Sequence, residues 1–272
     1  GLVGARVAVE PAISCGACRW CAAGYTNICP AVQFIGLPPL QGALQQYIVH
    51  PAHLLEPLPD GVSDEAGVIL EPLAVALHAV NLVRVRPGQS IVILGTGVLG
   101  TCVLALLALY RGIRVVCADL MPERLERARE MGADVTIRPD PDADEEVARQ
   151  IRSAAGAEGA DIVFECAGAP QTMWNMCEVA APGAHLAVIG IPEDDRIIFS
   201  SGTSRRKGLT LRLIRRSVRT LRPCIELAGR GLIAPEKLVT HAFRATEVGR
   251  AFELVDAYAD GVLKALVDME QW

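Results

Sequence analysis

A glycine-rich turn constrains the fold of this 272-residue chain more than any other feature. It reads Gly95-Thr-Gly97-Val-Leu-Gly100, follows the apolar run Ile91-Val-Ile-Leu94 and precedes a Leu/Ala stretch typical of a helix. In a strand–turn–helix unit the first glycine permits the turn, the second lets the backbone approach a pyrophosphate, and the third lets helix and strand pack closely. The phosphates would lie on free N–H groups at the start of the helix. The pattern predicts a dinucleotide site that includes Gly95, Gly97, Leu99 and Gly100.

An acidic residue supports this prediction and bears on the choice of cofactor. Asp119 lies nineteen positions after Gly100, at the end of the next apolar run. A carboxylate there accepts hydrogen bonds from the ribose hydroxyls and repels a 2′-phosphate, which favours NAD over NADP. Arg124 is expected to offer its guanidinium plane to the adenine. The alternatives are a solvated acid at a strand end for Asp119 and an exposed helix charge for Arg124.

Short apolar segments alternate with amphipathic ones from residue 90 to residue 189, which is typical of a parallel sheet covered by helices on both faces. The expected strands are Ser90–Leu94, Arg114–Ala118, Asp134–Ile137, Asp161–Glu165 and His185–Ile189, and the expected helices are Leu99–Tyr110, Pro122–Met131, Asp144–Ala155 and Gln171–Ala180. A helix is expected over Glu71–Val83, after a capped start at Ser63. The first 60 residues, with runs such as Val7–Val9 and Tyr47–Val49, indicate a loop-rich β domain.

Composition excludes some partners. A net charge of −5 argues against nucleic acid. The uncharged stretch Ile91–Tyr110 is long enough to cross a membrane, but its glycines favour a strand, a turn and a buried helix, so no membrane association is expected. Five scattered cysteines lie in apolar contexts, as reduced thiols do in a cytoplasmic protein.

Four further cysteines, at positions 15, 18, 21 and 29, lie within fifteen residues. Four thiolates without an open coordination position are typical of a structural zinc ion, so Cys15, Cys18, Cys21 and Cys29 are predicted zinc ligands. An iron–sulfur cluster is the main alternative, because Pro30 follows the last cysteine as in ferredoxin runs. The final gap is too long for that run, however, and no second run exists. An unmetallated loop is the remaining alternative.

With these motifs the chain resembles the zinc-containing medium-chain alcohol dehydrogenases, most of all the sorbitol (polyol) dehydrogenase branch. The resemblance implies an α/β fold in which a Rossmann-type doubly wound parallel sheet, residues 77–212, is inserted in a loop-rich, partly β, GroES-like catalytic domain. That domain would comprise residues 1–76 and 213–272 and be incomplete here. The matching stretches are Gly4–Pro11, the four-cysteine run, Glu71–Ala74, Gly95–Gly100 with Asp119, Arg124–Ala128, Gly132-Ala133 and Val239–Phe243.

The resemblance also implies an activity: hydride transfer from a secondary alcohol, a polyol more than a simple alcohol, to NAD with zinc assistance. Glu71 matches a family glutamate beside the catalytic zinc; its alternative is an exposed carboxylate at a helix start. Ile214 is expected to meet the nicotinamide, and Arg215 and Arg216 to meet substrate hydroxyls.

The protein is expected to form a homo-oligomer, a dimer or a tetramer. Eight basic residues and no acidic one lie between Ser204 and Ile225, indicating a solvated or interdomain face, with attraction for phosphate-bearing ligands as the alternative.

Family members also carry an amino-terminal segment that supplies a cysteine and a Gly-His-Glu motif to the catalytic zinc. The chain starts just after the place of that motif, so we expect it to lack those ligands. An alternative function follows: a catalytically inactive fragment or binding module that retains the structural zinc and NAD sites.

Overall fold

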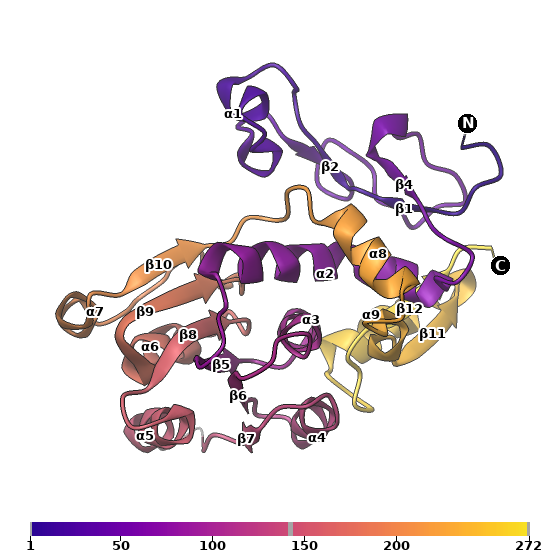
Figure 1. The fold of residues 1–272 in the computed structure, drawn as a ribbon. Helices are drawn as coiled ribbons and strands as arrows, with labels where there is room; N and C mark the ends of the chain where they lie inside the picture. Colours follow the sequence, from indigo (N-terminus) through magenta and orange to yellow (C-terminus); the bar gives the residue numbers. More distant parts are fainter. Residues whose placement is uncertain (1, 141–143, 271–272) are drawn as a thin grey trace. The chain divides into compact units, whose positions relative to one another are not determined.

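The computed structural model describes residues 2–140 and 144–270. The chain divides into two compact units, one comprising Gly1–Val75 with Arg215–Trp272 and the other Ala76–Ile214 (Figure 1). The second unit is therefore inserted into the chain of the first. Helix α2 (Asp64–Val83) begins in one unit and ends in the other.

The inserted unit holds a six-stranded sheet with the order β10-β9-β8-β5-β6-β7, in which all neighbours are parallel. This is the doubly wound dinucleotide-binding order, and it confirms the predicted fold class. The strands are β5 (Ser90–Leu94), β6 (Arg114–Ala118), β7 (Val135–Ile137), β8 (Ala160–Glu165), β9 (Ala180–Val188) and β10 (Thr210–Leu213). The helices are α3 (Val98–Leu107), α4 (Pro122–Glu130), α5 (Asp144–Ala155), α6 (Pro170–Val179) and α7 (Ser201–Lys207).

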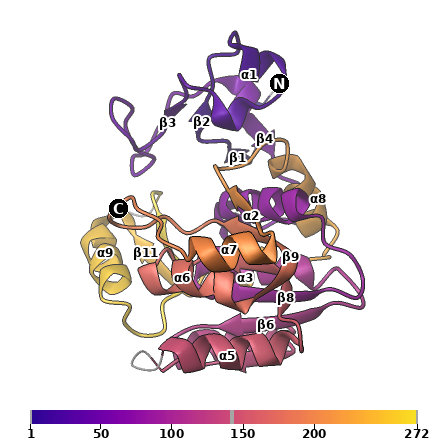
Figure 2. The same ribbon diagram turned by 90° about the vertical axis from the view of Figure 1, so that its left-hand side faces the viewer.

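Both faces of this sheet are buried, as an uninterrupted apolar strand requires. Val92 and Leu94 of β5 lie in one core with residues of α5 and α6. Figure 2 shows helix α5 running beneath strand β6 of this sheet. Ile91 and Ile93 point to the opposite face and are also fully buried. The uncharged stretch that begins at Ile91 is therefore a core strand followed by helix α3.

Helix α2 is the one described helix that is long and apolar enough to cross a membrane by length and composition. Half of its apolar window is buried inside the structure, and core helices pass the same test.

The other unit contains three two-stranded sheets. β1 pairs with β4 and β2 with β3, both antiparallel, whereas β11 and β12 are parallel. Their bounds are β1 (Val7–Val9), β2 (Ala12–Ile13), β3 (Gln33–Phe34), β4 (Leu55–Pro57), β11 (His241–Arg244) and β12 (Ala265–Asp268). The helices are α1 (Arg19–Ala22), α8 (Leu221–Gly229) and α9 (Val248–Asp256), with short 3-10 turns at Thr26–Ile28, Ala52–Leu54, Pro235–Leu238 and Ala245–Glu247.

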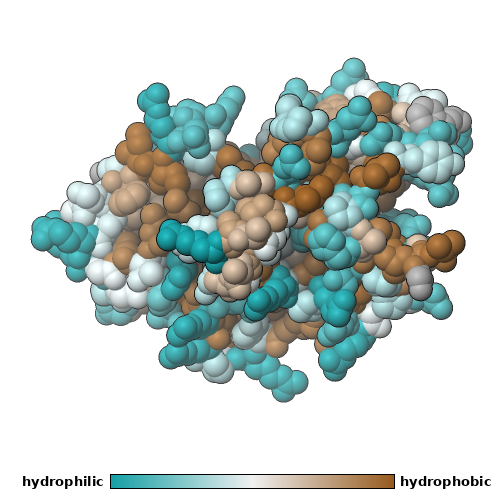
Figure 3. All heavy atoms as spheres, turned by 90° about the horizontal axis from the view of Figure 1, so that it is seen from above, coloured by the Kyte–Doolittle hydropathy of each residue, from teal (hydrophilic) through white to brown (hydrophobic). Residues whose placement is uncertain are grey.

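Several elements differ from the sequence-based expectation. Strand β9 begins at Ala180, five residues before the predicted start at His185, and it ends at Val188. No strand forms over residues 47–49, because no described strand pairs with them; Tyr47 and Val49 are 88% and 104% exposed. Exposed apolar side chains are found elsewhere on the molecule as well: on the face in Figure 3, they form several groups between hydrophilic residues. The predicted capped start at Ser63 is confirmed, because its Oγ accepts from the N–H of Ala66 at 3.1 Å; helix α2 then runs without a break from Asp64, with Pro72 inside it. Helix α7 was not expected in the basic stretch, although its Ser200 cap and the left-handed Gly208 after it are ordinary helix-end signals.

Candidate functional site

The glycine turn forms a close-packed cradle between β5 and α3. Gly95 has a φ of +90°, and a Cβ added there would lie 2.8 Å from the Cβ of Ala167. A Cβ on Gly100 would lie 1.9 Å from the carbonyl oxygen of Gly95. Gly97 caps α3 without a side-chain hydrogen bond, and Leu99 lies in the first turn. The turn therefore fits a pyrophosphate held by backbone N–H groups, as predicted for this motif.

Asp119 is fixed against this turn. The residue is 8% exposed, and its Oδ2 accepts hydrogen bonds from the backbone N–H of Thr96 at 2.6 Å and from the Thr96 hydroxyl at 3.1 Å. Oδ1 accepts from the N–H of Met121 at 2.9 Å. The alternative of a solvated acid is therefore wrong. Arg124 places Nη1 3.9 Å from Asp119 Oδ2, and its side chain is 21% exposed, so it is not a free surface charge.

Glu165, at the carboxyl end of β8, is a buried acid for which the sequence predicted no role. It is 0% exposed, and Oε1 accepts hydrogen bonds from the N–H groups of Ala167 and Gly168 and from the Thr172 hydroxyl, at 2.7–3.0 Å. Oε2 is buried without a partner among the described residues. Burial raises the pKa of Glu165, while the three hydrogen bonds oppose that shift. The sequence feature that could have identified Glu165 is a carboxylate at the end of an apolar strand. In the fold, that strand end lies next to the point where the strand order reverses, which is where such sheets bind ligands.

We expect Glu165→Gln to change how stability depends on pH. Because the pKa is raised in the folded state, the folded chain binds the proton more tightly than the unfolded chain does. The free energy of unfolding therefore falls as pH rises from about 4.5, the ordinary value, through the raised pKa. Glutamine keeps the Oε1 acceptor and cannot ionise. Relative to wild type, its free energy of unfolding should therefore rise between low and high pH, by about 1.4 kcal/mol for each pH unit by which the folded-state pKa exceeds the ordinary value.

Urea unfolding of Glu165→Gln and wild type at several pH values measures this gain. Glu130→Gln, at an exposed glutamate of α4, is the matched control. A difference between Glu165→Gln and wild type that stays constant across the pH range would contradict the expectation.

The four cysteines of the run come together in the other unit. All four Sγ atoms lie within 4.8 Å of one another, with Cys18 3.5 Å from Cys21 and 3.9 Å from Cys29, and Cys15 4.0 Å from Cys21. A tetrahedron with Zn–S bonds of about 2.3 Å has edges of about 3.8 Å. The sulfurs therefore fit a single ion, whereas the cysteines of an iron–sulfur cluster are distributed over several irons.

Backbone geometry prepares this loop for thiolates. The N–H of Cys18 donates to Cys15 Sγ at 3.4 Å, and the N–H of Cys15 donates to Cys29 Sγ at 3.5 Å. Hydrogen bonds from the N–H groups of Ala17 and Cys18 lower the pKa of Cys15 to about 6. Desolvation and the neighbouring Cys18 thiol raise the pKa of Cys21 to about 11. An ion entering the loop would therefore displace protons, as metal binding by cysteines does.

Glu71 lies among charged side chains of this unit, near enough to Glu10, Arg216 and Lys264 for electrostatic interaction with each of them. It is in the interior of α2 and half-buried, so the alternative of an exposed carboxylate at a helix start is wrong. Burial raises the pKa of Glu71, and the charges of Lys264 and Arg216 oppose that shift. Burial also raises the pKa of Glu10, with a further contribution from the Glu71 charge.

The predicted substrate arginines differ in their surroundings. Arg216 lies over the ring of Phe34, with its Cζ 3.9 Å from the ring centroid, and its Nη1 is buried without a partner among the described residues. Arg215 is exposed, and its carbonyl oxygen accepts from Asn27 Nδ2 at 2.9 Å. Ile214 ends the inserted unit, where its N–H donates to the Val188 carbonyl oxygen at 2.9 Å.

The described residues around Glu71 do not fit an open catalytic zinc site, which needs about three protein donors. Glu71 is accompanied by a second carboxylate, Glu10, and by two cations, Arg216 and Lys264. Within residues 2–140 and 144–270, the metal-binding arrangement found is the four-cysteine cluster.

Comparison with known proteins agrees with this fold. Residues 98–228 match the family model described as zinc-binding dehydrogenase, and residues 2–60 match the alcohol dehydrogenase GroES-like domain. Sorbitol dehydrogenase of Bacillus subtilis is 31% identical over 267 residues, covering 97% of this chain and 74% of the relative. L-idonate 5-dehydrogenase of Vitis vinifera is 34% identical over 257 residues, covering 93% and 69%.

Solved structures show the same fold. An Escherichia coli oxidoreductase/dehydrogenase of unknown specificity has a TM-score of 0.89 at 30% identity, covering 97% of this chain and 75% of that one. Two others each have a TM-score of 0.87 and cover 97% of this chain and 77% of their own. One, from Escherichia coli CFT073, is complexed with NADH at 26% identity, and the other, from Sinorhizobium meliloti, is bound to NADP at 27% identity.

The chain belongs to the zinc-containing medium-chain alcohol and polyol dehydrogenase family. Its six-stranded unit is the NAD(P)-binding domain of that family, and its relatives act as alcohol or polyol oxidoreductases.

Proposed function

We propose that this protein oxidises a secondary alcohol, a polyol in preference to a simple alcohol, with NAD as the hydride acceptor. The observation that carries the choice of NAD is the buried, triply hydrogen-bonded carboxylate of Asp119 beside the glycine turn. A fixed negative charge there binds ribose hydroxyls and repels a 2′-phosphate. The names of the sorbitol and idonate dehydrogenase relatives support a polyhydroxylated substrate.

In this proposal hydride passes from the carbinol carbon to the nicotinamide, and the hydroxyl loses a proton, giving a ketone and NADH. Gly95, Gly97, Leu99 and Gly100 receive the pyrophosphate at the start of α3, and Arg124 lies against the adenine. Ile214 borders the nicotinamide. Arg215 and Arg216 offer forked donors that suit several hydroxyls better than one.

We further propose that Cys15, Cys18, Cys21 and Cys29 hold a structural zinc ion, on the sulfur spacing described above. Zinc assistance at the reacting hydroxyl needs donors besides Glu71 and its described neighbours, so no step is assigned to a metal there. The open outer edge of β10, which pairs only with β9 among the described strands, supports a homo-oligomer. The absence of disulfides among the nine cysteines supports a cytoplasmic location.

A second candidate function is a binding module that takes up NAD and structural zinc without turnover. The observation that favours it is the surroundings of Glu71, where Lys264 and Arg216 supply positive charge in place of metal donors. An assay of NADH formation over a panel of polyols and short alcohols separates the two candidates. The assay uses the protein expressed from its whole gene. Turnover of polyols supports the enzyme. Tight NADH binding without turnover, in zinc-loaded protein, supports the module.

We expect Asp119→Ser to weaken NADH binding about 100-fold, because hydrogen bonds to a charged acceptor contribute about 1.5–3 kcal/mol each. The same change should narrow the difference between NADH and NADPH, since the charge that repels the 2′-phosphate is gone. Fluorescence titration with both nucleotides measures the two affinities. Asp119→Asn, which keeps the side-chain length and removes the charge, is the comparison variant. Wild-type protein that binds NADPH as tightly as NADH would disprove the role of Asp119.

A further inference from the structure

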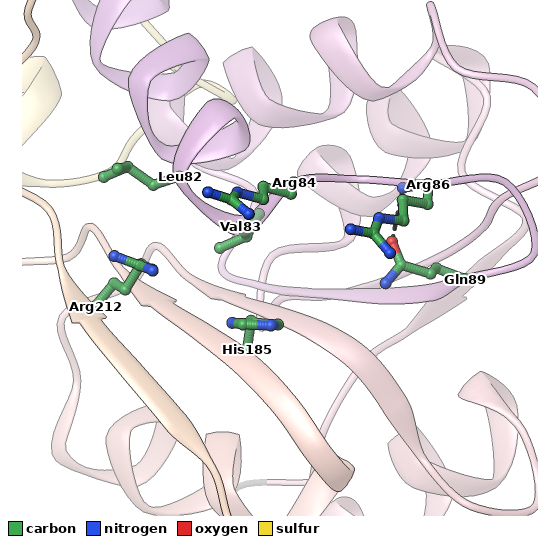
Figure 4. Close-up of a pocket in the computed structure, with 7 residues that line it drawn as sticks. All are labelled: Leu82, Val83, Arg84, Arg86, Gln89, His185 and Arg212. Atoms are coloured by element: carbon green, nitrogen blue, oxygen red, sulfur yellow. Dashed lines mark hydrogen bonds between the residues drawn. The ribbon is translucent and has the colours of Figure 1, made fainter.

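A cavity of about 280 Å³ opens in the inserted unit, with strongly basic walls (Figure 4). Arg84, Arg86 and Arg212 line it together with His185 and Gln89. The apolar end of helix α2 supplies the rest of its lining. All of these residues belong to the same compact unit, and none of them is acidic.

The strand register separates this cavity from the dinucleotide site. His185 is opposite Thr210, the first residue of β10, and Ile162 on β8, three residues before the carboxyl ends of β8 and β9. The glycine turn follows Leu94, which is level with Glu165 and Val188 at the carboxyl ends. Three residues along a strand correspond to about 10 Å. The cavity is therefore a second location on the sheet, and the pyrophosphate site does not explain its charges.

The same register places the basic groups on one face. Arg212 is level with Ala187, two residues after His185, so these side chains share the face opposite the core formed with α5 and α6. Figure 4 shows the guanidinium groups of Arg84 and Arg212 and the ring of His185 around a common space. Arg86 lies beside Gln89, whose Oε1 accepts from the Arg86 backbone N–H at 2.7 Å.

These charges are not neutralised within the part of the chain that the structure describes. The guanidinium groups of Arg84, Arg86 and Arg212 make no hydrogen bond or ion pair to a described residue, and Nδ1 of His185 is buried without a partner there. Like charges that line one cavity repel one another. Arg84 also has a φ of +58°, in the left-handed region where glycine or asparagine usually follows a helix. Such backbone strain is often found at functional sites.

We propose that this cavity binds a small phosphate-type oxyanion, either inorganic phosphate or the phosphoryl group of a phosphorylated metabolite. Guanidinium groups pair with phosphate oxygens through two parallel N–H donors, which a planar fork supplies and an ammonium does not. His185 Nδ1 adds a polar group inside the cavity. The volume, roughly nine waters at about 30 Å³ each, admits a phosphoryl group with a short organic chain and excludes a folded partner. This site is separate from the proposed oxidation and does not depend on it.

Calorimetric titration of the whole chain with inorganic phosphate, at constant ionic strength, tests the proposal. Saturating NADH fills the dinucleotide site in one series, and a second series omits NADH so that the result does not depend on the proposed function. The same titrations are repeated with glycerol 3-phosphate and with neutral glycerol. We expect both phosphates to bind and glycerol not to bind. Tighter binding of the ester identifies a phosphorylated metabolite as the ligand, and equal or weaker binding identifies inorganic phosphate.

Arg84→Gln with Arg212→Gln should weaken phosphate binding about 100-fold, since two charge-assisted pairs are lost. Arg212→Lys, which keeps the charge and loses the fork, should fall between this double variant and wild type. Arg111→Gln, at an exposed arginine outside the cavity, is the matched control and should bind like wild type. Absence of phosphate binding in wild type, or equal binding by the double variant and wild type, would overturn the proposal.

Discussion

Replacing Cys18 with serine should reduce the zinc content from about one ion per chain to less than about one tenth of that, because a thiolate ligand is removed from a closed four-sulfur site. Cys18 is central to the cluster, with its Sγ close to both Cys21 and Cys29. Its side chain also caps α1 by accepting from the N–H of Cys21. Without the ion, residues 15–29 retain only a four-residue helix and a 3-10 turn, so we expect them to unfold locally.

Metal analysis and limited proteolysis measure this effect. Cleavage should concentrate within residues 15–29, while NADH affinity stays within about twofold of wild type, because the nucleotide site lies in the other unit. Cys224→Ser, at a buried cysteine outside the cluster, is the control that should keep its zinc. Purified protein with a visible iron–sulfur absorbance and no zinc would contradict the assignment.

Gly100→Ala should destabilise the nucleotide unit by about 3 kcal/mol or more and weaken NADH binding more than about 100-fold. The added Cβ would lie 1.9 Å from the Gly95 carbonyl oxygen and 3.2 Å from Cγ2 of Ile93. The first of these neighbours is backbone, which cannot rotate away. Relief requires α3 to move away from β5, and that movement opens the turn that receives the pyrophosphate.

Two other glycines separate folding from binding in this experiment. A Cβ on Gly97 would meet its nearest atom, Arg124 Nη1, at 3.7 Å, so Gly97→Ala should keep the wild-type stability. It should weaken NADH binding, because the pyrophosphate approaches the backbone at this position. Gly249, in α9, has no atom within 4 Å of an added Cβ, so Gly249→Ala should be neutral or slightly stabilising. Denaturant unfolding and NADH titration of the three variants give the comparison. Equal stability for Gly100→Ala and Gly249→Ala would contradict the steric argument.

The sequence was most informative where local rules and the fold agree. The β5 and β6 bounds were predicted without error, because each strand is a short β-branched run enclosed by polar turns. The glycine spacing located the dinucleotide turn because only glycine tolerates the close backbone contact at Gly100. The cysteine run located the cluster because its ligands are neighbours in sequence.

Features that depend on contacts distant in sequence were not predicted. Glu71 was matched to a glutamate beside a zinc ion, and the charges of Arg216 and Lys264 that act on it were not foreseen, because both residues lie far along the chain. Glu165 received no role because its partners are two backbone groups and a threonine hydroxyl that a sequence pattern does not reveal. The cavity at Arg84 combines three segments, of which only the one with Arg212 lay in the basic stretch noted in the sequence.

The three hydrogen bonds of Asp119 have an evolutionary consequence. The carboxylate that would discriminate between the two nicotinamide cofactors also fixes Thr96, in the middle of the phosphate turn, and Met121, just before α4. A mutation that shortens this side chain to admit a 2′-phosphate therefore also removes the carboxylate acceptors of two backbone N–H groups. A mutation that changes the cofactor preference of this chain would therefore also lower the stability of the phosphate turn and of the start of α4. A lineage that changes preference must acquire a second substitution that satisfies those donors, which makes the change a two-step path.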